Sequence, residues 1–347
     1  MRIAHIAPIY LSVPPAKRGG TERIVFDLVE EQVRAGHEVT LFSVKTSKTS
    51  AKLEYLFNKP FTQEKDFQEW TSRREINLTL AHIEKALSKE DNFDVFHFHF
   101  DDFVPQFSPF IKKPILTTFH YVIDQKVYNL FRQRYQNYFP IALSHNQIKG
   151  LEGFSAVVPN GLNLNEIPFK DTKEDFLITA GRIVPDKGIK ESIDIAKSLQ
   201  EDLVIIGHVN PRVKRSVQYY EEHLAKDIDN QHIKHLDGLS HQELLEYFSR
   251  AKAFVFPLQW EEPFGLVVIE AMACGTPVVA LDRGAMREII KDKSTGFLCQ
   301  NVEEMKEALK KIDQIDPQAC RQHVQDNFSI SRVSKLYIEA YQHAINS

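Results

Sequence analysis

The chain is poor in cysteine and carries no surplus of basic charge. Its 347 residues include 3 cysteines (Cys274, Cys299 and Cys320), whose scattered positions indicate neither a disulfide framework nor a zinc site. A net charge of −4 argues against a dedicated nucleic-acid binder, because phosphate contacts need a basic surplus. No apolar run approaches the roughly 20 residues of a membrane span. No signal peptide precedes the first predicted strand, so we expect a cytoplasmic protein, with a peripheral membrane contact left open.

A full GxGxxG fingerprint is also missing, which argues against a dinucleotide cofactor. The N-terminal half instead contains an apolar strand at Ile3–Pro8 and a loop that ends in Gly19 and Gly20. A helix over Thr21–Ala35 and a strand over His37–Val44 follow. This order is typical of a Rossmann-like unit, in which the two glycines allow close approach of the backbone to a diphosphate.

The pattern starts again in the second half, which is consistent with two domains of ordinary size. A strand at Phe176–Ala180 leads into a turn that contains Arg182 and Lys187, and a helix runs on to Leu199. An arginine and a lysine five residues apart at a strand-to-helix turn suit a diphosphate, because one offers a planar fork and the other a point charge.

The most informative stretch is Trp260–Ala280. An apolar helix is predicted over Leu266–Ala273, between the terminator Gly275 and an N-terminal turn with Pro263 and Gly265. Unpaired N–H groups at such a helix start attract a phosphate or a sugar oxygen. Two carboxylates accompany this apolar stretch, Glu262 just before the helix and Glu270 inside it, and we interpret them as binders of hydroxyl groups.

This stretch resembles the signature of the family four retaining glycosyltransferases, which have the GT-B fold. The residues that carry the resemblance are Glu262-x₇-Glu270, Pro-Phe-Gly-Leu and Glu-Ala-Met-Ala-Cys-Gly-Thr-Pro-Val-Val-Ala. Gly20-Thr21-Glu22 and the segment Gly181–Gly188 match further motifs of the family, so the resemblance covers essentially the whole chain.

The resemblance implies an α/β protein with two doubly wound Rossmann-like domains facing across a cleft. We expect an acceptor-side domain over residues 1–161, a nucleotide-sugar-binding domain over 162–328, and a terminal helix over 329–347 that crosses back to the first domain. The implied activity is transfer of a hexose from a nucleotide-diphosphate sugar, with UDP favoured, to an acceptor hydroxyl. The acceptor is an unknown small molecule, lipid or glycan.

The resemblance also implies roles for individual residues. Arg182 and Lys187 would neutralise the leaving diphosphate, Glu262 would hold the donor sugar, and Glu270 would hold the ribose. The family places a histidine beside the donor sugar, and His120, at the end of the predicted strand Pro114–His120, matches it. Further donor-binding groups are the backbone at Gly19 and Gly20 and at Phe264, Gly265 and Leu266. The predicted catalytic set is therefore His120, Glu262, Arg182 and Lys187.

Two patterns allow a metal site, but neither is our preferred interpretation. His97 and His99 alternate on the predicted strand Phe93–Phe100 and precede Asp101 and Asp102, a set that suits zinc. We prefer a strand end that opens into the cleft. Asp227 and Asp229 form an Asp-x-Asp, which we interpret as a charge cluster that ends a helix. We expect no metal and no cofactor.

Two segments receive weaker predictions. The polar segment Lys45–Glu69 is expected to be mobile and receives no chemistry. An amphipathic, aromatic-rich helix is predicted over Val122–Asn137.

Three alternative functions remain. An alternative donor is GDP-mannose, which would make the chain a mannosyltransferase. A non-catalytic protein that binds sugar nucleotides is less favoured. A glycoside hydrolase would also use two carboxylates, but it has no use for the pair Arg182 and Lys187.

Overall fold

The computed structural model describes residues 1–17, 19–100, 103–131 and 134–347. The chain forms two compact units. Unit 1 comprises Met1–Leu162 together with Ile330–Ser347, and unit 2 comprises Asn163–Ser329. Among the described residues, no helix is long and apolar enough to cross a bilayer.

Unit 1 is built on a parallel sheet of 7 strands in the order β3-β2-β1-β4-β5-β6-β7. The strands are β1 (Arg2–Ile6), β2 (Glu38–Ser43), β3 (Lys52–Tyr55), β4 (Val95–Phe98), β5 (Ile115–Thr118), β6 (Tyr138–Ala142) and β7 (Ala156–Val157). The α-helices are α1 (Gly20–Arg34), α2 (Ser72–Leu87), α3 (Gln125–Phe131) and α11 (Ile330–Asn346).

The two faces of this sheet are covered by different helices, as the two-residue period of a strand requires. On one face, Ile3, Val95 and Leu116 pack against residues of α1 and α11. On the other face, Ala4 and Phe96 pack with residues of α2. Alternate side chains of β1, β4 and β5 therefore point toward α1 and α11. His5 and His97 share this face, because each is two residues from Ile3 or Val95.

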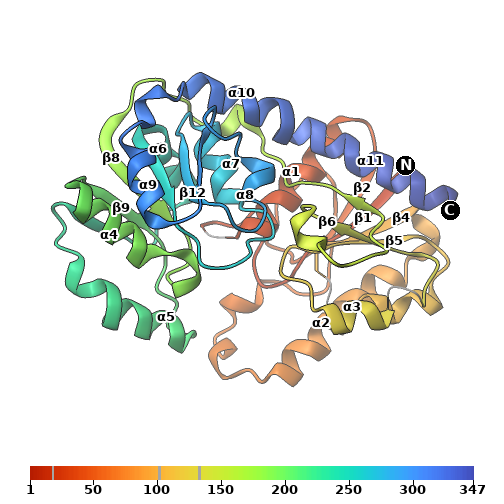
Figure 1. Cartoon of the computed structure of the whole chain (residues 1–347). Coiled ribbons are helices and arrows are strands. Elements are labelled where there is room, and N and C mark those ends of the chain that lie inside the picture. Colours follow the sequence, from red (N-terminus) through yellow and green to blue (C-terminus); the bar gives the residue numbers. More distant parts are fainter. Residues whose placement is uncertain (18, 101–102, 132–133) are drawn as a thin grey trace. The chain divides into compact units, whose positions relative to one another are not determined.

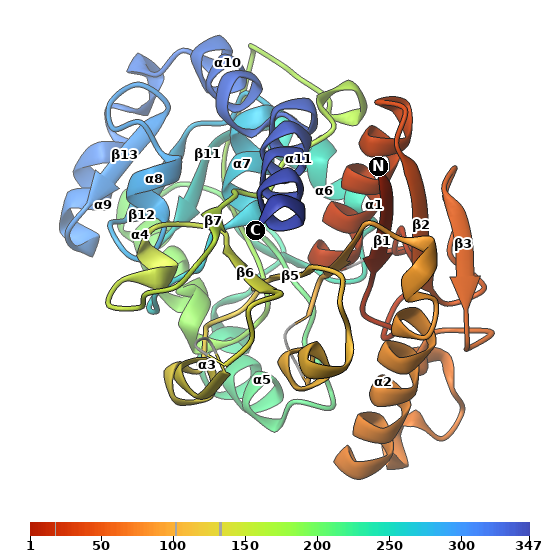
Figure 2. The same cartoon turned by 90° about the vertical axis from the view of Figure 1, so that its right-hand side faces the viewer.

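The C-terminal helix α11 is an integral part of unit 1. It lies alongside α1, as Figures 1 and 2 show. Its residues Tyr337 and Tyr341 are fully buried in the same cluster as Ile3 and Leu28. Gly161 allows this helix to approach closely, because a Cβ atom there would lie 2.9 Å from the side chain of Val333.

Two local predictions for unit 1 were wrong. The segment expected to be mobile contains β3, which pairs with β2 at the edge of the sheet (Figure 2), and it buries Phe61 and Phe67 against Trp70. The helix predicted over Val122–Asn137 begins only at Gln125, its described part ends at Phe131, and residues 134–137 are not helical.

Unit 2 has a parallel sheet of 6 strands in the order β10-β9-β8-β11-β12-β13. The strands are β8 (Glu174–Ala180), β9 (Leu203–Ile206), β10 (Ile233–Leu236), β11 (Ala251–Phe256), β12 (Val278–Leu281) and β13 (Gly296–Cys299). The helices are α4 (Ile189–Leu199), α5 (Lys214–Tyr219), α6 (His241–Arg250), α7 (Leu266–Ala273), α8 (Met286–Ile289), α9 (Val302–Leu309) and α10 (Pro317–Phe328). Both sheets have the doubly wound order, so the predicted α/β class is confirmed.

Helix α7 has the predicted bounds and is almost entirely buried. Its C-terminal end is held by two cations from elsewhere in unit 2, which satisfy carbonyls that a helix end leaves unpaired. Lys173 Nζ donates to the carbonyl of Cys274 at 3.1 Å, and Arg321 donates to that of Ala273 at 2.7 Å. These bonds anchor the helix far from its N-terminal end, where the predicted site lies.

Candidate functional site

The predicted residues of unit 2 gather where the strand order of its sheet reverses. In the order β10-β9-β8-β11-β12-β13, the neighbours β8 and β11 lead to opposite halves of the sheet. Open α/β sheets bind ligands at this switch point, outside the carboxyl ends of the strands. Arg182 and Lys187 follow β8, while Glu262 and the start of α7 follow β11. Topology therefore brings together residues about 80 positions apart in the chain.

Lys187 and Glu262 form a largely buried ion pair through Glu262 Oε2. The same oxygen accepts a bond of 2.8 Å from the indole N–H of Trp260. Lys187 Nζ also lies 4.9 Å from the centre of the Trp260 ring, within reach of a cation–π interaction. Burial lowers the pKa of Lys187, and the charge of Glu262 opposes that effect. Oε1 of Glu262 has no hydrogen-bond partner among the described residues, so one oxygen of this carboxylate is available.

Arg182 completes the cationic side of this cluster. It is exposed, and its guanidinium lies 6.0 Å from the centre of the Trp260 ring. Within the described part of the chain it forms no ion pair, whereas Lys187 is neutralised by Glu262. The cluster therefore presents one uncompensated positive charge.

The N-terminal end of α7 adds backbone donors beside the charges. Gly265 precedes the helix at φ 105°, a conformation that favours glycine. The N–H groups of Phe264, Gly265 and Leu266 have no acceptor in the described ranges. The side chain of Phe264 turns inward and packs on Phe328, so only its backbone can serve a ligand.

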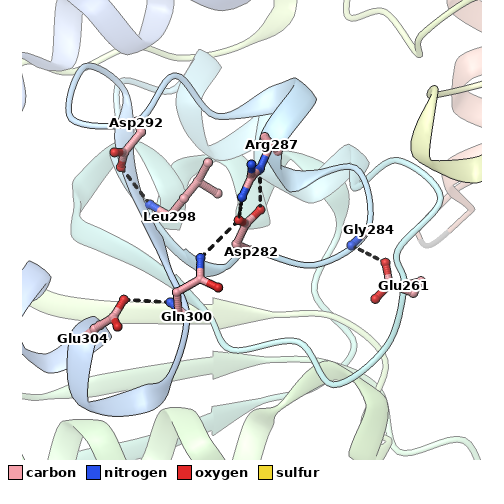
Figure 3. Close-up of polar contacts among 8 residues, drawn as sticks. All are labelled: Glu261, Asp282, Gly284, Arg287, Asp292, Leu298, Gln300 and Glu304. Carbon is pink, nitrogen blue, oxygen red and sulfur yellow. Dashed lines mark hydrogen bonds and ion pairs between the residues drawn. The ribbon is translucent and has the colours of Figure 1, made fainter.

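The loop after β12 holds the backbone of Glu262 through hydrogen bonds. The N–H of Ala285 donates to the carbonyl of Glu262 at 2.9 Å, and the N–H of Gly284 donates to the Glu261 carboxylate at 2.8 Å. Figure 3 shows this second contact, and it shows Asp282, at the start of the loop, held by Arg287 of α8 and by Gln300 after β13.

Gly284 has to be glycine for this contact to exist. Its φ is 58°, and a Cβ atom would lie 2.3 Å from the backbone nitrogen of Glu262. The support of Glu262 therefore depends on the absence of a side chain at a single position.

Glu270 lies on α7, and it is buried and paired with a histidine. Its Oε1 lies 2.7 Å from Nε2 of His241, the first residue of α6. Its second oxygen has no partner among the described residues. Glu270 thus resembles Glu262, because each carboxylate is oriented through one oxygen and leaves the other one available.

In unit 1, Gly19 and Gly20 lie at the N-terminal end of α1. Gly19 has φ 139°, and a Cβ atom there would collide with Leu11, Pro15 and the carboxylate of Glu22. Glu22 is buried in the first turn of α1, and burial raises the pKa of its carboxyl group. The lack of a side chain at Gly19 thus allows the backbone to pack closely against Leu11, Pro15 and Glu22 where the helix begins.

His120 follows β5 and is half-buried, and its Nε2 lies 3.4 Å from Nδ1 of His99. Burial lowers the pKa of His120 to about 4, so the imidazole is neutral at pH 7. His99 and His97 are themselves buried, which corrects the expectation that this strand end is open. Asp101 and Asp102, the carboxylates of the zinc interpretation, lie outside the described residues.

His5, His97 and His99 have ring nitrogens within 4.8 Å of one another, as a metal site would need. All six of their ring nitrogens, however, already have hydrogen-bond partners within unit 1. A metal ion would have to break several of these bonds in a fully buried place, so the geometry favours a hydrogen-bonded cluster.

The Asp-x-Asp pair lies at the end of the helical segment after α5. Asp227 forms an ion pair with Lys197 at 2.7 Å, and Asp229 accepts bonds from the backbone N–H groups of Gln231, His232 and Ile233. Both carboxylates thus have local structural partners.

The sequence did not reveal three neighbours of the predicted site. The first is Trp260, which received no role although it begins the informative stretch. The other two are His241, which contacts Glu270 from 29 positions away, and Gln32, which contacts His5 from 27 positions away. The one signal for His241 was that a buried carboxylate such as Glu270 needs a partner.

Comparison with known proteins assigns the class that the fold and this cluster define. Residues 18–166 match the model of Glycosyltransferase Family 4, and residues 163–322 match that of Glycosyl transferases group 1. Together these matches extend through both units. The protein has the GT-B fold and belongs to the family four glycosyltransferases, which confirms the predicted family.

The individual relatives have low sequence identity to this chain, and the first curated ones match only about half of it. The chain is 30% identical to an uncharacterized glycosyltransferase of Methanocaldococcus jannaschii over 178 residues, which are 48% of this chain and 46% of that protein. It spans about half the length of the first curated relatives that it matches. The structure resembles sucrose-phosphate synthase of Thermosynechococcus elongatus (TM-score 0.78, 20% identity, 99% of each chain). It also resembles an Anabaena protein solved with UDP and glucose (TM-score 0.75, 17% identity, 99% and 100% of the two chains).

Proposed function

We propose that this protein transfers a hexose from a nucleotide-diphosphate sugar, with UDP favoured, to an acceptor hydroxyl, with retention of anomeric configuration. The observation that carries the proposal is the cluster in unit 2. Two cations, a set of free helix N-terminal amides and two carboxylates with one available oxygen each lie around one switch point. A diphosphate, a sugar and a ribose need these three kinds of group.

In the proposed reaction, the bond between the anomeric carbon and the diphosphate oxygen breaks, and a bond to the acceptor oxygen forms on the same face. The leaving diphosphate oxygen takes the proton of the acceptor hydroxyl. Arg182 and Lys187 stabilise the negative charge that grows on the diphosphate, together with the amides at Phe264–Leu266. No enzymic nucleophile is required.

The pairing of Lys187 with Glu262 has a role in this scheme. Before the donor binds, each ion neutralises the other, so neither charge is buried alone. A bound diphosphate would share Lys187, while the available oxygen of Glu262 would accept hydrogen bonds from sugar hydroxyls. Glu270, oriented by His241, would accept bonds from the ribose.

UDP is favoured because a structural neighbour was solved with UDP and glucose, and no acidic residue stands out as a partner for guanine. A second candidate donor is GDP-mannose. The chain is 24% identical to phosphatidyl-myo-inositol mannosyltransferase of Mycobacterium leprae over 86% of its length. Both donors require the same diphosphate cluster.

The test is turnover of a panel of UDP- and GDP-hexoses by the purified protein, with the anomeric configuration of the product read by proton NMR. We expect a UDP-hexose to be consumed and its configuration to be retained. Consumption of GDP-mannose alone would select the second candidate, and an inverted product would overturn the proposed mechanism. A protein that binds these donors but never turns them over would be a sugar-nucleotide-binding protein.

A further inference from the structure

Unit 1 contains a chain of buried polar side chains that ends at His120. Its members come from the ends of β1, β4 and β5 and from helices α1 and α11. The members are His120, His99, His5, Gln32, Tyr341, His97, Thr118 and Tyr337. All of them except His120 are at most 1% exposed.

Each contact in the half nearest His120 has a single donor when the histidines are neutral. His5 Nε2 lies 2.8 Å from Gln32 Oε1, which can only accept, so His5 carries its proton on Nε2. His5 Nδ1 must then accept from His99 Nε2, at 2.9 Å. His99 Nδ1 is left to accept from His120 Nε2, at 3.4 Å.

The far half continues in the same direction. Gln32 Nε2 donates to the hydroxyl of Tyr341 at 3.3 Å. Among the described residues, His97 Nδ1, at 2.7 Å, is the acceptor left for the hydrogen of that hydroxyl. His97 Nε2 then donates to Thr118 Oγ1 at 2.7 Å. One orientation of the Gln32 amide therefore sets the proton positions of four histidines.

The cluster is well suited to remain neutral. Burial lowers the pKa of His5 to about 4 and holds the pKa of His97 and His99 well below the usual value, and the nearby imidazoles of the cluster oppose a charge on His97 and His99. Glu22, the buried acid in the first turn of α1, forms no ion pair with these histidines among the described residues. A neutral histidine has one donor and one acceptor nitrogen, so its tautomer decides what it offers to a ligand.

We propose that this buried chain fixes His120 in the Nε2–H tautomer, so that Nδ1 presents a lone pair outward. His99, His5 and Gln32 are then positioning residues, since they act through His120. Nδ1 of His120 has no partner among the described residues, so it is the atom left for a ligand. If His120 contacts the donor sugar, which rests on the proposed function, the matching ligand group is a hydroxyl that donates its hydrogen.

The direct test is long-range proton–nitrogen NMR of the unmodified protein labelled with ¹⁵N-histidine, at pH 7.5. We expect His5, His97, His99 and His120 each to show a protonated Nε2 and an unprotonated Nδ1. A protonated Nδ1 on His120, or averaged shifts of its two nitrogens, would overturn the proposal. This readout does not depend on any enzymatic activity.

A matched pair of variants tests the remote control by Gln32. Gln32→Met removes the acceptor for His5 while keeping a side chain of similar length. We expect His120 to show averaged nitrogen shifts in this variant. Tyr337→Phe, at the far end of the chain, is the control and should leave His120 unchanged. Unchanged His120 shifts in folded Gln32→Met would overturn the relay.

Kinetics extend the test to the ligand. We expect Gln32→Met to lower kcat/KM for sugar transfer about tenfold, at the low end of the losses known for groups that orient a functional imidazole in metal sites. If no nucleotide sugar is turned over but the NMR pattern is as expected, the proposed function fails and the tautomer assignment stands. If transfer occurs and the pattern is absent, the relay fails alone.

Discussion

The two units share a doubly wound strand order but differ in the polar groups at the ends of their strands. In unit 1, neutral histidines lie in or just after β1, β4 and β5, and all of them except the half-buried His120 are buried. In unit 2, the loops after β8 and β11 supply the ion pair of Lys187 and Glu262 and the exposed Arg182. The same topology thus places side chains at the carboxyl ends of the strands in both units. The residue types at these ends determine whether they offer neutral hydrogen bonds or charge.

The largest expected difference between the units is their response to acid. Five histidines of unit 1, four of them buried and one half-buried, have a lowered pKa because burial disfavours their charged form: His5, His82, His97, His99 and His120. Since the unfolded histidines have a pKa near 6.5, the unfolded state binds more protons below that pH. Stability is therefore fully present above about pH 6.5 and is lost as the pH falls toward about 4. Each pKa unit of each group corresponds to about 1.4 kcal/mol, so five lowered groups make unit 1 strongly sensitive to acid.

The protein has one tryptophan in each unit, so this prediction can be measured unit by unit. Trp260→Phe leaves Trp70 as the reporter of unit 1, and Trp70→Phe leaves Trp260 as the reporter of unit 2. We expect urea unfolding at pH 5 to shift more at Trp70 than at Trp260, relative to pH 7.5. Protonation of Glu22, whose pKa is raised by burial, works in the opposite direction but is a single group. Equal shifts of both reporters would contradict the contrast.

Gly284→Ala should damage unit 2 locally. Alanine would have to adopt the positive φ of this position, which is unfavourable for it, and its Cβ atom would collide with the backbone of Glu262. We therefore expect a loss of about 2–4 kcal/mol in the free energy of unfolding, together with reduced turnover. Gly36→Ala in unit 1 is the matched control, because Gly36 also has a positive φ but nothing lies within 4 Å of its Cβ position. Chemical unfolding of both variants compares them. Equal losses would mean that contact with Glu262 contributes nothing.

Glu262 and Glu270 should separate into sugar and ribose binders. Glu270→Gln weakens a charge-assisted bond to the ribose, so we expect affinity for the free nucleoside diphosphate to fall by about 1–3 kcal/mol. Glu262→Gln should leave that affinity nearly intact while lowering turnover, because the diphosphate lacks the sugar. Calorimetry with UDP measures both. The opposite pattern would reverse the proposed orientation of the donor along α7.

The smallest expected effect is that of metal removal. Arg182 and Lys187 are proposed to neutralise the diphosphate, and Asp227 already forms an ion pair with Lys197. Sugar transfer in excess EDTA should therefore equal transfer in magnesium. Activity that only a divalent cation restores would contradict metal independence and would direct attention back to Asp227 and the histidine cluster.

The sequence predicted best where one local pattern determines the structure. Helix α7 was predicted with its observed bounds because an apolar run lies between Gly265 and Gly275. Strand β3 was missed because Lys52–Tyr55 is a short, largely exposed edge strand whose burial pattern carries no apolar period.

Partners far apart in the chain were beyond the reach of local spacing. The contact of Glu270 with His241 and the chain from His120 to Gln32 depend on the packing of helices against sheets. The sequence did place His97 and His99 on one face of a strand. It did not show that α1 and α11 cover that face, which is what turns two strand-end histidines into a buried network.

The most direct test of the central proposal, that unit 2 binds the diphosphate by charge, is calorimetric titration of UDP into two lysine variants. Lys187→Met removes the cation that pairs with Glu262, whereas Lys190→Met removes a cation three residues away that pairs with Asp194 at the surface. We predict that Lys187→Met weakens UDP binding about tenfold or more, since bonds to charged groups contribute about 1.5–3 kcal/mol. Lys190→Met should bind UDP like the unmodified protein. Equal affinity of all three proteins for UDP would contradict the account.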